Sequence, residues 1–364
     1  MNQYNKGVDK LLKASFFKIV RLGIGLQEDP SPDKVDWQNI QALALQQGLS
    51  ALALDGVGRL PESQRPPKRE LIQWIGETLQ YESKYAIQKK SAKEMALLFH
   101  NNAIRTYVLK GDVVAECYPN PIHRLRADLD CFLLPLNRDF DAWKLGNDLI
   151  RGKGFNVETI FYKNSTIILP GLMVENHRFF TPFRGNKRLM RLERVLQTML
   201  REDKGEDRFE GTWLYRPPVM VTALFLIEHA YSHFLHEGLT WKHILDWMMF
   251  SKKHKNEIQW AEFSVLIDEF WFRRFYDSYV RLGEFLFGER TEGELSREDQ
   301  MILNDVWAPL ALHETARGVK GKLALARNTW RARWKYRYFS DISMLHALWI
   351  QVKGFLFIKH PKLN

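Results

Sequence analysis

The sequence is poor in cysteine and has no long apolar run. Cys117 and Cys131 are the only cysteines among 364 residues, and they have neither C-x-x-C spacing nor a partner cluster. We therefore expect two structural thiols in a reducing compartment. No apolar run reaches the length of a membrane span, about 18 residues, and the first six residues, MNQYNK, hold no apolar signal-peptide core. We expect a cytoplasmic chain without a transmembrane segment.

Several nucleotide-binding and catalytic motifs are also missing. The glycine pairs at 23–25 and 152–154 lack the third glycine of a dinucleotide-binding loop. HRLRADLD is neither followed by D-F-G nor preceded by a glycine-rich loop, which excludes a protein kinase. Glu228 precedes His229, so the zinc-protease order H-E-x-x-H is absent as well.

Positive charge is concentrated at one end of the chain. The net charge is +10, and residues 317–364 contain eleven Lys and Arg against one acid, Asp341. The first 316 residues are therefore neutral overall, and any attraction for polyanions is expected from the tail.

Apolar periodicity divides the chain into a helical start, a strand-rich middle and a helical end. Helical spacing occurs at 9–25, 36–60 and 69–101, where the last segment is one long helix or two abutting ones. Strand signals follow in RTYVLKG, DLDCFLLP, FNVETIFY, STIIL and LMVENHRFF, before helical spacing returns near residue 186. The predicted class is α+β, with a small mixed sheet between helical lobes. We expect an N-terminal helical lobe at 1–103, a core at 104–183, a C-terminal helical lobe at 184–316 and a basic aromatic tail at 317–364.

The stretch VLKGDVVAECYPNPIHRLRADLDCFLLP, residues 108–135, contains the strongest chemical signal. Residues two apart on a strand share a face, so Asp128 and Asp130 should project together. Two adjacent carboxylates repel unless cations or hydrogen bonds compensate, and Mg²⁺ binds carboxylate oxygens together with substrate phosphates. The pair predicts a magnesium (or manganese) site, although an Asp-x-Asp pair alone is common on surface strands.

Flanking residues extend this hypothesis. In LMVENH, Glu175 and His177 share one face of a second strand. A third carboxylate on a neighbouring strand would complete a site for two metal ions. Residues suited to phosphate contacts precede the acids: Lys110, Gly111, Arg124 and Arg126.

This order of elements resembles the nucleotidyltransferase superfamily, which has the polymerase-beta-like fold. More narrowly, the chain resembles the bacterial uncharacterised nucleotidyltransferase family in VLKG, YPNPIHRLRADLD and VENH. The family also has a later helix with spaced histidines that ends in Asp, and the matching element here is IEHAYSHFLHEGLTWKHILDW. The opening DWQNIQALALQQGLSALALDGVGRLP is similar too, so the resemblance covers about residues 35–250.

The resemblance implies in-line transfer of a nucleoside monophosphate from a nucleoside triphosphate to a hydroxyl acceptor, with release of pyrophosphate. It implies that Asp128 and Asp130 hold two metal ions, and that Glu175 binds the catalytic metal and helps to deprotonate the acceptor. Lys110, Gly111 and the two loop arginines would contact the triphosphate. Many superfamily members have Ser or Gly where this chain has Asp112, and an acid there suits a triphosphate only if it points away.

We expect five further residues to support the site from outside the metal: His177, His229, His233, Lys242 and Asp246. His229 and His233 are one helical turn apart and could share a metal ion, with His236 nearby. The interpretation that we favour is that these histidines hydrogen-bond toward the active site or satisfy core groups.

Two other functions stay open on the sequence alone. A module of the same fold that has lost turnover would still bind nucleotides, and Asp112 favours this alternative. An adaptor would instead act through residues 317–339, where aromatic side chains interleave with basic ones. Such a segment can bind RNA, lie on an anionic membrane, or pack on the body of the protein with a solvated basic face.

Overall fold

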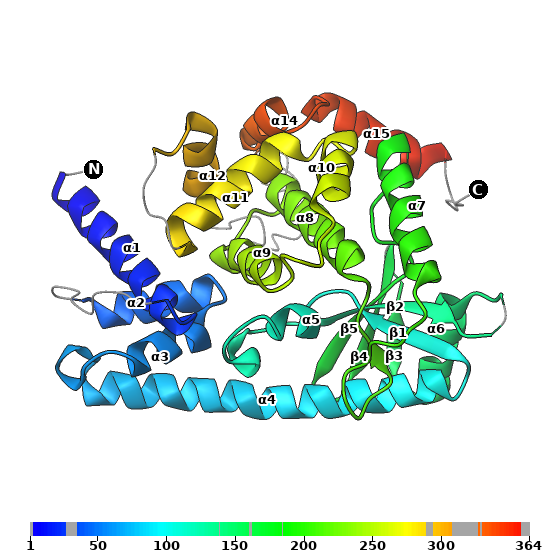
Figure 1. Cartoon of the computed structure of the whole chain (residues 1–364), viewed down its shortest axis with the longest axis horizontal. Coiled ribbons are helices and arrows are strands. Elements are labelled where there is room, and N and C mark those ends of the chain that lie inside the picture. Colours follow the sequence, from blue (N-terminus) through cyan, green and yellow to red (C-terminus); the bar gives the residue numbers. More distant parts are fainter. Residues whose placement is uncertain are drawn as a thin grey trace.

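The computed structural model describes residues 3–26, 35–137, 139–159, 162–183, 185–288, 294–307, 327 and 330–357. In this part of the chain, helical regions at both ends flank one mixed six-stranded sheet (Figure 1). The α+β class predicted from periodicity is thereby confirmed. None of the described helices is both long and apolar enough to cross a membrane.

The N-terminal region begins with α1 (Gln3–Gly23), α2 (Trp37–Gln46), α3 (Ser50–Gly58) and α4 (Lys68–His100). Helix α4 is one continuous helix of 33 residues, which at 1.5 Å per residue is roughly 50 Å long. It runs along the base of the molecule from the N-terminal helices to the sheet (Figure 1). The buried Trp74 fixes it to α3, because its ring N–H donates to the carbonyl oxygen and to the hydroxyl of Ser50.

The strands are β1 (Ile104–Val108), β2 (Leu129–Pro135), β3 (Asn156–Glu158), β4 (Asn164–Leu169), β5 (Leu172–His177) and β6 (Leu214–Tyr215). Their order across the sheet is β3-β4-β5-β2-β1-β6. The β2–β5 and β1–β6 pairs are parallel and the other pairs are antiparallel. The first five strands coincide with the strand signals in the sequence. The two-residue β6 is too short to leave such a signal.

The helices that follow β1 are α5 (Asp112–Ala115), α6 (Ala142–Gly152), α7 (Lys187–Glu202), α8 (Val219–His236), α9 (Trp241–Lys253), α10 (Trp260–Glu269), α11 (Arg273–Phe287), α12 (Arg297–Trp307), α14 (Arg333–Phe339) and α15 (Met344–Phe357). Helices α8 and α9 lie above the sheet in Figure 1, on the opposite side from α4.

Side chains of β2 alternate between these two sides. Leu133 lies against α6 so closely that a Cβ on Gly146 would be 2.5 Å from Leu133 Cδ1. Phe132, on the other face, stacks on Phe180, which in turn contacts α8 through Phe225. Because side chains alternate along a strand, Asp130 shares the face of Phe132 and is directed toward α8.

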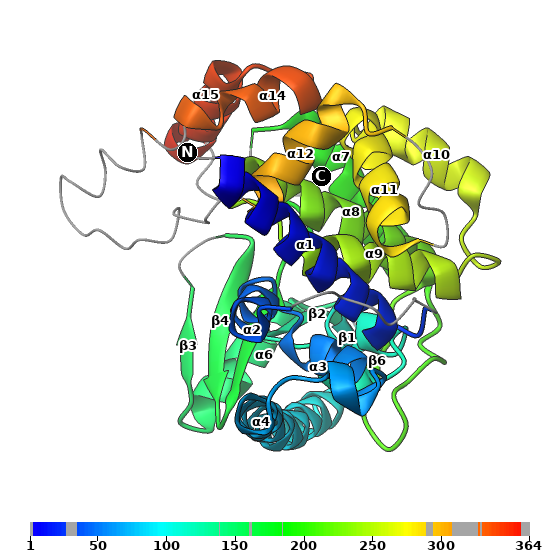
Figure 2. The same ribbon diagram turned by 90° about the vertical axis from the view of Figure 1, so that its left-hand side faces the viewer.

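The two helical regions also contact each other. Phe17 of α1 makes edge-to-face contacts with Trp241 of α9, Phe287 of α11 and Trp307 of α12. Helix α1 crosses these helices in the second view (Figure 2). These ring contacts therefore join the N-terminal helices to the C-terminal ones.

Part of the basic tail belongs to the packed body. Residues 308–326, 328, 329 and 358–364 lie outside the described residues, and with them much of the predicted polyanion-binding segment. Within α14, Lys335 is buried and its Nζ lies 2.7 Å from Asp305 Oδ2. Tyr336 and Phe339 are buried as well. Three exposed arginines lie on α14 or just before it and are here termed the tail arginines: Arg331, Arg333 and Arg337.

Candidate functional site

The predicted acids meet where β2 and β5 run side by side. In the parallel register, Asp130 of β2 is the direct partner of Glu175 of β5, and Asp128 immediately precedes β2. The alternate residue of β5, Asn176, faces away and bonds Asn147 of α6 at 3.0 Å. In the pattern VENH, Asn176 thus anchors one face of β5 to α6. The carboxylate of Glu175 lies on the opposite face, beside the Asp-x-Asp pair.

Two nitrogen-bearing side chains, Lys110 and His177, hold the central carboxylate. His177 Nε2 donates to Asp130 Oδ1 at 3.0 Å and lies 3.5 Å from Glu175 Oε2. Lys110 Nζ lies 3.2 Å from Asp130 Oδ2. Asn164 of β4 donates to Glu175 Oε2 at 3.1 Å. The sheet therefore presents three acids with a lysine and a histidine set between them.

These contacts affect the three acids differently. Burial alone would raise the pKa of Asp130, but Lys110 and His177 outweigh it and hold that pKa well below its ordinary value. The hydrogen bond from His177 lowers the pKa of Glu175. Burial, and then repulsion by Asp130, raise the pKa of Asp128. Asp130 and Glu175 are therefore ionised at neutral pH, and Asp128 carries the unfavourable charge of the group.

This donor set fits a divalent cation. One ligand atom each from Asp130, Glu175 and His177 lies within 4.8 Å of the other two. Asp130 Oδ2 is buried, and within the described part of the chain it has no hydrogen-bond partner apart from the Lys110 ion pair. Carboxylate oxygens are the ligands that Mg²⁺ and Mn²⁺ favour. Asp130 and Glu175 therefore offer oxygen atoms suited to such an ion, whereas Asp128 is not part of this group.

The turn after β1 brings Lys110 and Gly111 to the acids. Gly111 has φ +68°, a value that favours glycine, and α5 begins at the next residue. Asp112 is held by an ion pair with Arg126 and by the hydroxyl of Tyr85 at 3.2 Å. The Arg126 guanidinium also lies over the Tyr85 ring, 4.5 Å from its centroid. The charge of Asp112 is therefore compensated by its own neighbours.

A family comparison agrees with this arrangement. The model of a family described as "Uncharacterised nucleotidyltransferase" matches residues 33–288. The chain belongs to this family. The match includes α2 to α11 and thus the sheet, the three acids and the histidines of α8 and α9. No curated protein and no solved structure matches the chain.

A second polar group of this nucleotidyltransferase family member lies between the Asp-x-Asp loop and α9. Arg124 is buried and binds Asp246 through two hydrogen bonds, Nε to Oδ1 at 2.8 Å and Nη2 to Oδ2 at 2.6 Å. Tyr118 donates to the same carboxylate at 2.7 Å, and Lys242 lies 3.4 Å from it. Burial, and then repulsion by Arg124, lower the pKa of Lys242 to about 8. Three of the residues singled out in the sequence therefore meet here, beside the acids.

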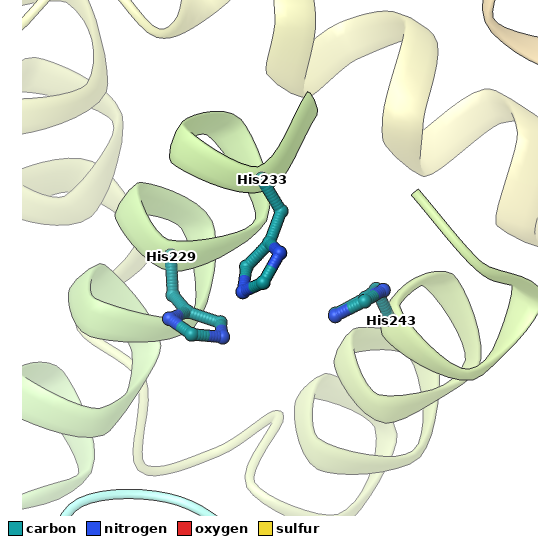
Figure 3. A group of neighbouring side chains, drawn as sticks. All are labelled: His229, His233 and His243. Carbon is teal, nitrogen blue, oxygen red and sulfur yellow. The ribbon is translucent and has the colours of Figure 1, made fainter. Parts of the chain in front are cut away.

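A third group consists of histidines (Figure 3). His229 and His233 of α8 face His243 of α9. Lys110 links this group to the acids, because its Nζ is 2.9 Å from His229 Nε2. Burial, and then the charge of Lys110, hold the pKa of His229 well below its ordinary value. Sequence reasoning missed His243, since the spacing along one helix pointed to His236, which is exposed and outside the group.

Proposed function

We propose that this family member is a metal-dependent nucleotidyltransferase that transfers a nucleoside monophosphate from a nucleoside triphosphate to a hydroxyl acceptor. The observation that carries the proposal is the direct pairing of Asp130 with Glu175 on parallel strands, with Asp128 two residues before Asp130. Three carboxylates on one edge fit a hard divalent cation, and a lysine already compensates part of their charge. The family match supports the general activity. The metal, the residue roles and the acceptor belong to the proposal.

Asp128, Asp130 and Glu175 would hold Mg²⁺ or Mn²⁺. The bound ions would supply positive charge to the triphosphate and to the attacking oxygen. In the transfer, the acceptor oxygen forms a bond to the α-phosphorus, the bond from that phosphorus to the bridging oxygen breaks, and pyrophosphate leaves. The proton of the acceptor hydroxyl passes to a carboxylate of the site. Glu175 is suited to receive it, because within the described residues its Oε2 binds His177 and Asn164 while no hydrogen bond involves Oε1.

Lys110 is the cation best placed to meet the triphosphate. It contacts Asp130, and attraction by Asp130 and Asp128 keeps its pKa raised despite burial, so it stays protonated. We assign Gly111, Arg124 and Arg126 to the same phosphate-binding surface. Arg126 Nη2 is buried and has no hydrogen-bond partner among the described residues, so it has a donor left for phosphate. Arg124 would contribute charge while it remains bound to Asp246.

The proposal is tested by pyrophosphate release from each nucleoside triphosphate in the presence of cell extract as the acceptor source. Release should require Mg²⁺ or Mn²⁺ and should disappear with a chelator. It should be lost in Asp130→Asn and Glu175→Gln, and retained in Asp148→Asn, a matched change at an exposed carboxylate on α6 that pairs only with Arg151 in the described structure. Full release by purified Asp130→Asn would refute the metal site.

A further inference from the structure

Three histidine rings converge between α8 and α9, on a different set of elements from the carboxylates (Figure 3). His229 and His233 are one turn apart on α8, and His243 faces them from the first turn of α9. One ring nitrogen from each residue lies within 4.8 Å of the other two. Zinc holds imidazole nitrogens at about 2.0–2.1 Å, which places tetrahedral ligands about 3.3 Å apart. Each pair of nitrogens therefore needs to approach by at most about 1.5 Å.

We propose that His229, His233 and His243 form a binding site for a divalent transition-metal ion of the zinc class, separate from the carboxylate site. Imidazole nitrogen suits Zn²⁺, Co²⁺ and Ni²⁺, whereas carboxylate oxygen suits Mg²⁺ and Mn²⁺. The two groups of side chains would therefore select different ions. This inference does not depend on nucleotide transfer by the acids.

His233 is already oriented as such a ligand. Its Nδ1 lies 2.8 Å from Glu237 Oε2, one turn further along α8. A carboxylate accepts only, so Nδ1 carries the proton and Nε2 presents its lone pair. A carboxylate that fixes the outer nitrogen of a histidine ligand is the usual support of a metal-bound imidazole.

His229 presents a lone pair in the same way. The ammonium group of Lys110 donates to His229 Nε2 at 2.9 Å, which leaves the ring proton on Nδ1. A metal ion at this site would replace Lys110 as the partner of His229. Lys110 would keep its ion pair with Asp130, 3.2 Å away, so its charge would not be left without compensation.

His243 needs a shift of its ring proton. Its Nδ1 accepts the backbone N–H of Thr240 at 3.1 Å and lies 2.9 Å from the Thr240 hydroxyl. Metal ligation through Nε2 requires the proton on Nδ1, which would then donate to the Thr240 hydroxyl oxygen and no longer accept from the Thr240 backbone N–H. The capping residue of α9 would then support the third ligand, as Glu237 supports the second.

A fourth coordination position has room for water. A cavity of about 30 Å³ is lined by two of the rings, His229 and His243, together with Lys110 and Lys242. This volume accommodates a water molecule. Three histidines with one exchangeable position are a known zinc arrangement.

The test is calorimetric titration of chelator-stripped, full-length protein with Zn²⁺ in excess Mg²⁺, which keeps the carboxylates occupied. We expect one Zn²⁺ per chain. His233→Ala and His243→Ala should each weaken binding at least about 100-fold, and Glu237→Gln about 10-fold, the usual effect of losing an outer partner. His236→Ala, on the same helix but outside the group, and Glu175→Gln, at the acids, should leave the affinity unchanged.

Co²⁺ gives a second readout that involves no catalysis. Tetrahedral nitrogen coordination should produce strong visible absorption that Glu237→Gln weakens and His233→Ala removes. Thermal unfolding without metal checks that each variant folds, and Glu237→Gln changes a partly exposed side chain. Absent Zn²⁺ binding, or equal affinity in wild type and folded His233→Ala, would overturn the proposal. Loss of Zn²⁺ in Glu175→Gln alone would overturn it too, by placing the ion at the acids. None of these outcomes bears on nucleotide transfer.

Discussion

Separate replacement of Asp130 and Asp128 by Asn should change the stability of the metal-free protein in opposite directions. Asp130 is buried between Lys110 Nζ at 3.2 Å and His177 Nε2 at 3.0 Å. Although burial alone would raise its pKa, Lys110 and His177 hold the pKa well below its ordinary value. Asn would leave Lys110 and His177 without their carboxylate. Since loss of one partner of a buried ion pair costs about 3–5 kcal/mol, we expect a loss of about 3 kcal/mol.

Asp128 is in the reverse situation. Burial and the neighbouring Asp130 raise its pKa, so at pH 7 its charge opposes folding. Asn keeps the shape of the side chain and removes the charge. Because a raised pKa means that the folded state disfavours the ionised carboxylate, removal of this charge should raise the free energy of unfolding at pH 7.

The assay is chemical denaturation at pH 7 in the presence of a chelator. Asp148→Asn is the control, since surface changes of this kind alter stability by about 0.5 kcal/mol or less, and the Asp148 side chain is 52% exposed. An Asp130→Asn protein as stable as wild type would refute the ion-pair reasoning. A destabilised Asp128→Asn protein would refute the repulsion.

Three further predictions concern the surroundings of the site. Arg124→Ala should lower the free energy of unfolding by about 3 kcal/mol. The double variant Arg124→Ala with Asp246→Ala should lose less, because it leaves no unpaired buried carboxylate. Equal losses of the two proteins in chemical denaturation would contradict this. His123 bonds Asp55 and Glu82 at 2.8 Å each, and these bonds raise its pKa although burial alone would lower it. The stability that protonated His123 contributes should be complete below pH 6.5, its ordinary pKa, and be lost as pH rises through the raised value; a stability profile that His123→Gln leaves unchanged would disprove this. If RNA is the acceptor, neutralising the tail arginines should reduce the slope of log binding constant against log salt concentration by about 2. The measurement is the fluorescence anisotropy of labelled RNA across a salt series, and RNA binding that does not change with salt would exclude this role for the tail.

Local patterns predicted most of the elements that form the site. The strands at Asp130 and Glu175 were readable because apolar residues alternate with the acids, and this alternation reflects one buried and one functional face. The glycine at 111 marked the end of β1, because its positive φ favours that residue type. The order of the motifs was consistent with pairing of β2 with β5. The pairing itself, and its register, are established only by the structure of the sheet.

Contacts between distant segments were not readable. Arg124 and Asp246 are 122 positions apart. The sequence around either residue does not indicate that the Arg124 guanidinium is already paired with the Asp246 carboxylate. Asp112 looked unfavourable for a phosphate site until Arg126 and Tyr85 were placed beside it. Periodicity along one helix cannot identify a partner on the next helix, which is why His243 was missed.

The tail shows the same limit. Composition described residues 317–339 as a basic aromatic segment, but Lys335 is 3% exposed and bonds Asp305. From sequence alone, a basic residue on a helix is predicted to be exposed to solvent, because the acidic residue that pairs with it in the folded protein is not known. The surface available for RNA in the described part of this segment is therefore smaller than its charge suggested.

The most direct test of the central claim follows the two ends of the triphosphate separately. Purified protein with Mg²⁺ and cell extract is incubated with nucleoside triphosphate labelled at the α-phosphorus or, in a parallel reaction, at the γ-phosphorus. The account predicts that the α label becomes attached to an acceptor while the γ label is released in pyrophosphate, and that Glu175→Gln abolishes both. Attachment of the γ label instead, or no attachment of either label by the wild-type protein with any of the four nucleotides, would contradict it.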